Sequence, residues 1–394
     1  MVGDRSRAQH RGTIVLGEWR SASHQPDILQ YCRCVRALQG RIGPQSGKVA
    51  VLEINNGTLP GRIVEIAYAF WRSKALFAAM ELDIFSKLAD GPLHLATLIS
   101  RTGVHERGAR DFFDSLVALG LLNRDADGRY SNAPESDHYL VRNKSSYLGG
   151  LLKHLDARHY QNWSSLTQAL ITGEPQSILG TDTYDGLYAD EPTQELFLNG
   201  MTAGSWLAAQ ALARKFPWNR YQTFIDIGTA QGCVPVEIAR VHPHLRGGGF
   251  DLATVEPAFT RYVRKHGLSD RLQFYCGDFF ADPLPEADVL IMGRVLHNWD
   301  RSTRTMLLDK AYHAISSGGA LIIYDPLIDE RRRESHGLLS SLNMLIETAG
   351  GAEYTAAECE SWMARAGFQN IRVEPLQDVH TAVIGFKLDS PVET

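Results

Sequence analysis

The fold of this chain is decided by the stretch Thr223-Phe224-Ile225-Asp226-Ile227-Gly228-Thr229-Ala230-Gln231-Gly232. Apolar residues lead into an acid and then into a turn of small residues, and a helix-like apolar run follows at 234–241. This order predicts a strand, a tight turn and a helix. Such a turn points free helix N–H groups at a ligand and lets the ligand approach the backbone closely.

Two acids farther along indicate which ligand the turn binds. Asp251 ends the run Gly249-Phe250-Asp251, and Asp278 lies within Tyr275-Cys276-Gly277-Asp278-Phe279-Phe280. An acid about 20 residues beyond a glycine turn is placed to hold ribose hydroxyls, so the pattern predicts a nucleoside-type cofactor. The turn is neither a dinucleotide fingerprint nor a P-loop, because the required glycine and lysine spacings are missing. The alternative, a plain strand-to-helix turn without a ligand, is disfavoured by the two acids.

The composition is typical of a globular protein. The chain has 394 residues, of which 44% are apolar and 22% charged, which fits two domains or one large one. A net charge of −5 gives no general attraction to nucleic acid. No apolar stretch approaches the roughly 18 residues of a membrane span, and the N-terminal residues lack the apolar core of a signal peptide.

The cysteines are few and scattered. Their odd count, without a disulfide framework, is typical of a reducing compartment, so we expect a cytoplasmic protein. The pair Cys32-x-Cys34 could be half of a metal site, but no matching Cys/His pair accompanies it. We interpret the two as incidental thiols and expect no metal.

Four segments are expected along the chain. Residues 1–57 show no sustained periodicity and are interpreted as an N-terminal extension, either disordered or loosely attached. Residues 58–145 combine helical patterns with a hairpin signal at Asp125-Ala126-Asp127-Gly128. Residues 146–215 predict several helices rich in aromatic side chains, with a loop at 173–190. From residue 216 to 394, strands and helices alternate.

The second segment predicts three helices and a hairpin, a winged-helix arrangement. Its first helix, expected from Arg62 to Leu88, presents a broad apolar surface: Ile63, Ile66, Ala67, Phe70, Ala75, Phe77 and Ala78. The third helix, expected at 105–119, turns four apolar residues inward: Phe112, Phe113, Leu116 and Leu119. DNA binding is one interpretation, but the arginines of this helix are nearly cancelled by Asp111 and Asp114, whereas a DNA-reading helix usually has a basic face. We therefore expect dimerisation and no nucleic-acid partner.

The last segment predicts an α/β domain. Strands are expected near 223–227, 246–251, 271–276, 288–292, 319–324 and 382–387. Their alternation with helices predicts a mostly parallel sheet covered on both faces. Ligands bind such sheets outside the carboxyl ends of the strands, where Gly228, Asp251, Asp278 and His297 are expected to lie.

Further motifs match a known family in order and spacing. They are Phe224–Gly228, His242–Gly247, Phe250–Leu252, Gly277–Phe280, Asp282–Pro285, Val295–Trp299, Ser317–Gly319, Gly350–Thr355 and Ala366–Phe368. On these motifs the chain, from about Arg62 to Lys387, resembles the caffeate, isoflavone and acetylserotonin O-methyltransferases, including bacterial members that modify antibiotics. The resemblance implies a Rossmann-like class I methyltransferase domain, S-adenosylmethionine as cofactor, and an N-terminal winged-helix domain that forms a homodimer.

The resemblance also implies roles for single residues at the cofactor. The glycine turn, through Gly228, Ala230 and Gly232, is expected at the methionine end. Asp251 is expected to hold the ribose beside Leu252. Asp278 is expected to accept from the adenine amino group beside Phe279, and Arg294 is a further candidate for cofactor binding.

Three catalytic residues are implied by the same resemblance. His297 matches the general base, Asp325 stands where the family usually has Glu, and Glu353 matches the second acid. An imidazole with a pKa near 6.5 can take the proton of a phenol at neutral pH, and a carboxylate on its far nitrogen would fix the tautomer. The chain departs from the family pattern at Ala230, usually Gly, and at Asn298, usually Asp.

The acceptor pocket is expected to involve Trp163, Phe197, Met201 and Met344, with His154 a further candidate. Phe197 and Met201 share a helix face at i, i+4, a spacing that more often means core packing.

The combined prediction is methyl transfer to a hydroxyl group of an aromatic small molecule in secondary metabolism. The alternatives are C- or N-methylation, a non-methylating enzyme that binds the same cofactor, and a winged-helix DNA-binding regulator.

Overall fold

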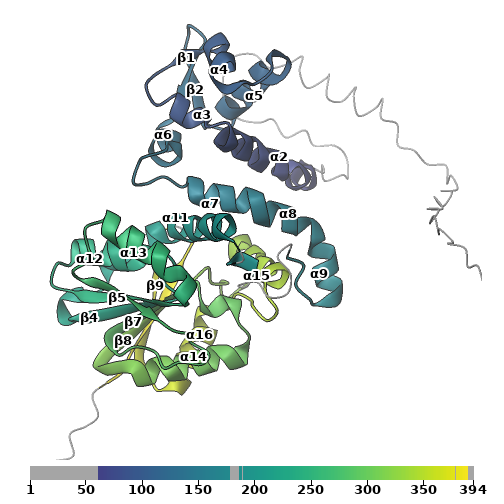
Figure 1. The fold of residues 1–394 in the computed structure, drawn as a ribbon. Helices are drawn as coiled ribbons and strands as arrows, with labels where there is room; N and C mark the ends of the chain where they lie inside the picture. The colour runs from purple at the N-terminus through teal and green to yellow at the C-terminus, as the bar shows by residue number, and fades with distance from the viewer. Residues whose placement is uncertain (1–60, 178–185, 189, 378, 389–394) are drawn as a thin grey trace, which may run out of the picture. The chain divides into compact units, whose positions relative to one another are not determined.

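The computed structural model describes residues 61–177, 186–188, 190–377 and 379–388 (Figure 1). The chain from Ile63 onward forms one compact unit. The extension expected at 1–57, with Cys32 and Cys34, lies outside the described residues, as does the middle of the loop expected at 173–190. None of the described helices is long and apolar enough to cross a membrane.

The first described region is mostly helical. Its helices are α2 (Gly61–Glu81), α3 (Ile84–Lys87), α4 (Leu95–Thr102), α5 (Glu106–Ala118) and α6 (Pro134–Leu140). They accompany a small antiparallel sheet in the order β1-β3-β2, made of β1 (Leu93–His94), β2 (Leu122–Arg124) and β3 (Arg129–Asn132). The hairpin forms at the predicted turn, where the Gly128 N–H donates to the Asp125 carbonyl at 3.0 Å.

The core of this region includes two of the predicted inward residues, Phe113 and Leu116, both fully buried. The prediction for Leu119 is wrong: this side chain is 36% exposed because it caps the end of α5 and no longer lies on the packed turns.

The first predicted helix is divided at Asp83, which has a positive φ of 55° and begins α3. Only the C-terminal half of α2 is buried, whereas Ile63 and Ile66 are 73% and 67% exposed. The broad apolar surface expected of this helix is therefore uncovered over its first turns.

A second group of helices connects the two sheets. It contains α7 (Gly149–His154), a π-helical turn (Leu155–His159), α8 (Tyr160–Asn162), a 3₁₀ turn (Trp163–Ser165), α9 (Leu166–Thr172) and the long α11 (Glu191–Lys215). The Asp190 carboxylate caps α11 by accepting from the Thr193 N–H at 2.8 Å. Helix α11 packs against both α7 and α12 (Cys233–Val241). π-Helical turns occur frequently at functional sites, and this one connects α7, which packs against α11, with α8.

The larger sheet contains seven strands among the described residues, in the order β6-β5-β4-β7-β8-β10-β9. They are β4 (Thr223–Ile227), β5 (Arg246–Asp251), β6 (Leu272–Cys276), β7 (Ala287–Gly293), β8 (Ile315–Asp325), β9 (Gln369–Pro375) and β10 (Thr381–Phe386). Strands β4 to β8 pair in parallel, and β10 runs antiparallel between β8 and β9. The predicted α/β class and mostly parallel sheet are confirmed, and the strand order is Rossmann-like.

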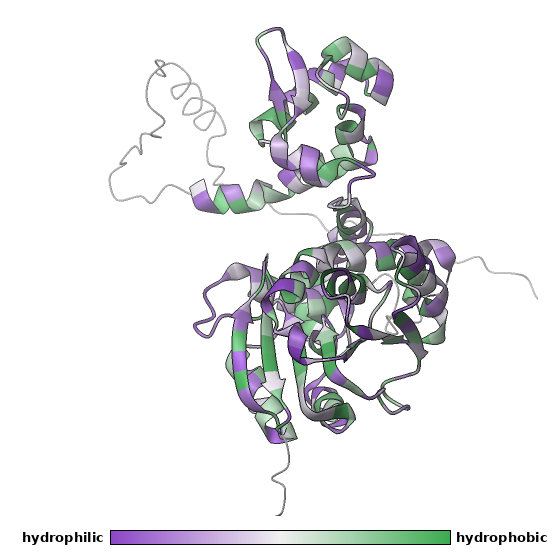
Figure 2. Ribbon diagram, turned by 90° about the vertical axis from the view of Figure 1, so that its left-hand side faces the viewer, coloured by the Kyte–Doolittle hydropathy of each residue, from purple (hydrophilic) through white to green (hydrophobic). Residues whose placement is uncertain are grey.

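Both faces of this sheet are covered by helices, because successive side chains of a strand point to opposite faces. On one face, Phe224 and Ile291 pack with residues of α11, α12 and α13 (Glu256–Lys265). On the other, Ile225 and Leu290 pack with residues of α14 (Arg301–Ala314) and α16 (Ala356–Ala366). Figure 2 shows the resulting concentration of hydrophobic residues along the strands.

Strand β9 was not predicted from the sequence. It pairs only with β10, at the edge of the sheet, and its residues are exposed or half-buried. An edge strand needs no continuous hydrophobic run, so the mixed sequence Gln369–Pro375 carries little strand signal.

Candidate active site

A cavity of about 440 Å³ lies at the carboxyl ends of β4 to β7. Its sheet side is lined by residues that follow the strands: Gly228, Thr229, Ala230, Asp251, Leu252, Gly277, Asp278, Phe279, Phe280, Gly293, Arg294, Val295 and Trp299. The opposite wall includes Phe197, Met201, Thr202 and Ser205 of α11, together with Tyr188. This is the crevice where open parallel sheets bind ligands.

The turn after β4 reverses the chain through residues with positive φ. These values are 71° at Gly228, 50° at Ala230 and 87° at Gly232. A Cβ at Gly228 would lie 2.9 Å from the Val295 side chain, so glycine is also required there for space. Ala230 holds a conformation that costs an L-residue energy, at the position where the family pattern has glycine.

Asp251 links the glycine turn to the end of β5. Its two oxygens accept from the backbone N–H groups of Ala230 at 2.9 Å and Leu252 at 2.8 Å. Burial raises the pKa of Asp251 to about 6, and the two N–H groups oppose this shift. A carboxylate has about four lone-pair positions, so Asp251 keeps acceptor capacity for the hydroxyls of a ligand.

Asp278 and Phe279 form the wall after β6. The Asp278 carboxylate accepts from the Phe280 N–H at 2.8 Å, which also makes it a local turn cap. The ring of Phe279 meets that of Phe280 edge-on at 4.9 Å between centroids, and that of Trp299 at 5.9 Å. The three rings give this end of the cavity an aromatic surface suited to a flat heterocycle.

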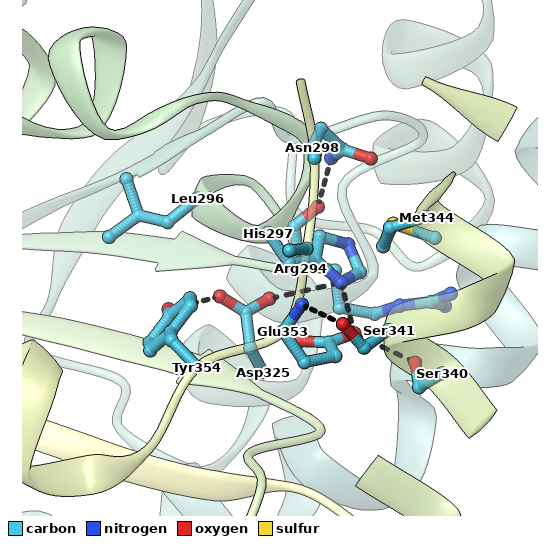
Figure 3. A network of polar contacts seen from close by, with 12 residues as sticks. Arg294, Leu296, His297, Asn298, Asp325, Ser340, Ser341, Met344, Glu353 and Tyr354 are labelled. Carbon is cyan, nitrogen blue, oxygen red and sulfur yellow. Dashed lines mark hydrogen bonds and ion pairs between the residues drawn. The ribbon is translucent and has the colours of Figure 1, made fainter. Parts of the chain in front are cut away.

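His297 lies in the 3₁₀ turn Leu296–Asn298 after β7 and is buried with two acids (Figure 3). Its Nδ1 is 2.8 Å from Oε1 of Glu353, whereas the nearer oxygen of Asp325 is 3.8 Å away. The Ser340 hydroxyl donates to the same Glu353 oxygen at 2.7 Å. Glu353 is therefore the acid that orients the imidazole, a choice that the sequence left open between the two carboxylates.

Asp325 ends β8 and is held by a different partner. Its Oδ2 accepts from the Tyr354 hydroxyl, while Oδ1 has no hydrogen-bond partner among the described residues. Burial raises the pKa of Asp325 to about 6, and the nearby imidazole opposes this shift. Asp325 therefore acts on His297 through its charge.

The pKa of His297 reflects these neighbours. Burial lowers it, but the charges of Glu353 and Asp325 and the Glu353 hydrogen bond raise it by more, so the net shift is upward. A protonated imidazole is thus stabilised at this position.

Asn298, which stands where the family pattern has aspartate, donates two hydrogen bonds within its turn that an aspartate could not donate. Its Nδ2 donates to the carbonyls of Arg294 at 2.9 Å and Val295 at 3.3 Å. An aspartate has no proton to donate at neutral pH. In this chain residue 298 closes the turn that carries His297.

The predicted acceptor residues divide into two groups. Phe197 and Met201 line the cavity. Trp163 lies outside its lining and donates from Nε1 to Oδ1 of Asn343 at 2.9 Å. Met344 is buried and also lies outside the lining, although Figure 3 draws it in the surroundings of His297. Gly232 also lies outside the lining, at the start of α12, where a Cβ would be 2.7 Å from Phe259.

Several lining residues were not singled out from the sequence. Asp226 is one: burial raises its pKa to about 8. An acid inside an otherwise apolar strand was its available signal. Tyr188, Ser205 and Tyr324 also line the cavity, but no local pattern marks them, because only the folded chain brings their elements together.

The sheet order, the strand-end cavity and the histidine–carboxylate pair define a Rossmann-like methyltransferase. Residues 163–369 match the O-methyltransferase domain, and residues 64–142 match the O-methyltransferase dimerisation domain. The chain belongs to this O-methyltransferase family.

Individual relatives agree with this assignment. The chain is 42% identical, over 83% of its length and 97% of the relative's, to the tetracenomycin polyketide synthesis 8-O-methyltransferase TcmO of Streptomyces glaucescens. It is 35% identical to the N,N-dimethyltransferase OxyT of Streptomyces rimosus, over 80% and 93% of the two chains. The structure of human N-acetylserotonin methyltransferase in complex with SAM aligns with a TM-score of 0.78 at 27% identity, over 85% and 100% of the two chains.

Replacing Ala230 by glycine tests the strained turn. We expect Ala230→Gly to raise the free energy of unfolding by up to about 1 kcal/mol, because glycine tolerates positive φ without the steric cost. Urea unfolding measures this change. Ala208→Gly, in the interior of α11, is the matched control and should destabilise by about 0.5–1 kcal/mol. An equal decrease in the free energy of unfolding in both variants would contradict the strain at Ala230.

Neutralising the two acids separately tests their different contacts with His297. Glu353→Gln should lower kcat by roughly 10²-fold or more, because the amide no longer fixes the tautomer. Asp325→Asn should cost only about tenfold, since the Nδ1 hydrogen bond remains.

The pH dependence of the same variants follows from the raised pKa of His297. A base works when neutral, so activity should rise as pH increases through this pKa. Removing either negative charge lowers the pKa and should move the acidic limb of the kcat profile to lower pH. If the acidic limb of the kcat profile keeps its position in both variants, His297 is not the group that titrates.

Proposed function

We propose that this chain transfers a methyl group from S-adenosylmethionine to a hydroxyl group of an aromatic small molecule in secondary metabolism, with His297 as general base. The observation that carries the proposal is the buried His297–Glu353 hydrogen bond of 2.8 Å. The histidine of this pair lies in the turn between Val295 and Trp299, which both line the cavity. The similarity to TcmO, named for 8-O-methyl transfer in polyketide synthesis, supports the reaction type and setting.

The cavity fits the cofactor in size and in chemistry. Gly228 and Ala230 provide a close backbone approach for the methionine portion. Asp251 has acceptor capacity for ribose hydroxyls, and Asp278 with Phe279 suits the adenine. The similarity to human N-acetylserotonin methyltransferase, solved with SAM, supports the same assignment. When bound, S-adenosylmethionine supplies an electrophilic methyl group on a sulfonium.

The residues of the chain would do three things. The cavity walls hold the acceptor hydroxyl in line with the reacting centre, and such positioning can supply a large part of the rate enhancement. His297 takes the hydroxyl proton on Nε2, because Glu353 holds Nδ1. Glu353 and Asp325 then stabilise the imidazolium, in agreement with the upward shift of the His297 pKa.

N-Methylation is the second candidate, favoured by the similarity to OxyT, which is named as an N,N-dimethyltransferase. A neutral amine attacks without prior loss of a proton, so its methylation depends less on a base. C-Methylation and a non-methylating reaction remain the further alternatives, with no observation that favours them.

Label transfer with His297→Ala separates these functions. We expect wild-type enzyme to move labelled methyl from S-adenosylmethionine to the oxygen of a naphthol, catechol or hydroxyquinone, and His297→Ala to lose about 10²–10⁴-fold in kcat. His313→Ala replaces an exposed histidine of α14 and serves as control. Transfer to nitrogen, or transfer to oxygen that survives the His297 change, would contradict the proposal.

We infer further that the chain forms a homodimer through its dimerisation domain. The N-terminal half of α2 exposes Ile63, Ile66, Phe70 and Trp71 by 52–73%, and such patches mark association surfaces. These residues lie in or just before the region that matches the dimerisation domain.

A charge on this surface should disrupt the dimer. Ile66→Glu is expected to yield a monomer in sedimentation velocity, because a buried unpaired carboxylate is costly. Ile171→Glu is the matched control, since Ile171 of α9 is 74% exposed. The inference fails if Ile66→Glu sediments as a dimer.

A further inference from the structure

Arg304 is a buried cation at the beginning of α14. It is the fourth residue of this helix, and only 6% of it is exposed. A positive charge is unfavourable near the N-terminus of a helix, because the helix dipole is positive there. Burial of a charged group costs further free energy unless its donors find partners. Contacts with other parts of the fold therefore have to stabilise this arginine.

Two backbone carbonyls accept hydrogen bonds from the guanidinium of Arg304. Its Nε donates to the Leu296 carbonyl at 3.0 Å, and its Nη2 donates to the Ala352 carbonyl. Leu296 directly precedes His297, and Ala352 directly precedes Glu353. One side chain thus joins the two chain segments that carry the imidazole and the carboxylate of the proposed base.

Two aromatic rings hold the guanidinium in place. Its Cζ lies 4.9 Å from the ring centroid of Tyr354 and 5.3 Å from that of Trp362. Guanidinium groups stack favourably on aromatic faces, and the attraction is stronger where water is excluded. The Tyr354 hydroxyl in turn donates to Asp325. The position of Arg304 is therefore set by the same residues that surround the two acids.

The two joined segments also contact each other directly. The Ala352 N–H donates to the His297 carbonyl at 2.9 Å. A Cβ at Gly351 would lie 2.6 Å from the same carbonyl, so glycine allows this close approach. Glu353 belongs to neither a helix nor a strand, and its position depends on tertiary contacts. The hydrogen bond from Arg304 is such a contact, made one residue before the carboxylate.

We propose that Arg304 is a positioning residue for the base, which holds the peptides before His297 and Glu353 so that imidazole and carboxylate stay at hydrogen-bond distance. The inference rests on the proposed methyl transfer, in which His297 takes the acceptor proton. Arg304 is not among the described residues that line the cavity, so it acts through the pair and not on the substrate. A guanidinium suits this task because its N–H groups form a rigid planar fork, which an ammonium lacks.

The tautomer of His297 tests the proposal without turnover. The full-length protein, saturated with S-adenosylhomocysteine and isotope-labelled at its histidine nitrogens, is observed by NMR above the pKa of His297. The signal of His297 is the one that disappears in His297→Ala. Wild type should carry the proton on Nδ1, where Glu353 accepts it. Arg304→Met should give a mixture of both tautomers, and Arg304→Lys, which keeps the charge but loses the fork, should give a smaller proportion of the second tautomer.

Kinetics in two backgrounds provide the second readout. Arg304→Met should lower kcat by roughly 10- to 100-fold, because a misplacement of about 1 Å can cost about 10²-fold. The KM for the acceptor should stay within about twofold, since its binding site is unchanged. In the Glu353→Gln background the same change should cost less than about threefold, because residues that act as a unit are not additive. A merely structural role of Arg304 predicts equal losses in both backgrounds.

Arg271 provides the matched control. It also donates to backbone carbonyls, those of Ala239 at 2.9 Å and His242 at 3.2 Å, but these lie at the end of α12. Arg271→Met should leave the His297 tautomer and kcat as in wild type. Affinity for S-adenosylhomocysteine within about twofold of wild type shows that a variant is folded. If Arg304→Met fails this check, Arg304→Lys is judged by the same criteria.

Two results would overturn the proposal. One is a folded Arg304 variant in which His297 keeps the proton on Nδ1 as in wild type, and the other is an equal loss of kcat in both backgrounds. The tautomer is measured without methyl transfer, so it also separates this proposal from the proposed function. A tautomer that responds to Arg304 in a protein that methylates no oxygen would contradict the proposed function and leave the positioning role supported.

Discussion

The common edge at which β4, β5, β6, β7 and β8 end is the constraint on which the rest of the structure depends. Parallel pairing brings the carboxyl ends of these strands to one side of the sheet. Asp251 and Asp325 are the last residues of β5 and β8, and Gly228 and Arg294 directly follow β4 and β7. Residues as far apart in the sequence as Gly228 and Tyr324 therefore line one cavity, and no single loop has to provide the whole site.

Within this arrangement, the two acids beside His297 do different work because they have different partners. Glu353 shares one oxygen between His297 and Ser340, which fixes the direction of the hydrogen bond. Asp325 accepts a hydrogen bond from the Tyr354 hydroxyl, and its Oδ1 lies 3.8 Å from Nδ1 of the imidazole. Charge can act at that distance, particularly in a buried site, whereas tautomer selection requires a hydrogen bond. A shorter acid at position 325 is thus compatible with the base as long as Glu353 is present.

The sequence predicted those parts of the site that depend on local patterns. The strand and turn at 223–232 and the strand-end position of Asp251 follow from short apolar runs and small residues, whereas Asp325 was expected only through the resemblance to the family. The partner of His297 did not follow, because Glu353 lies in the loop between α15 (Ser335–Glu347) and α16, and only tertiary packing decides which acid comes closer. The edge strand β9 and the exposure of Leu119 were missed for a related reason. At the edge of a sheet or the end of a helix, the burial of a side chain no longer follows the periodicity of the element.

Arg294 opposes the two acids at the base. Its positive charge lowers the pKa of His297, whereas the charges of Glu353 and Asp325 raise it. The two acids outweigh both this cation and the burial of the imidazole, so the net shift of the His297 pKa is upward. The protonation equilibrium of His297 therefore depends on the charges of both carboxylates, although only Glu353 makes the hydrogen bond to Nδ1.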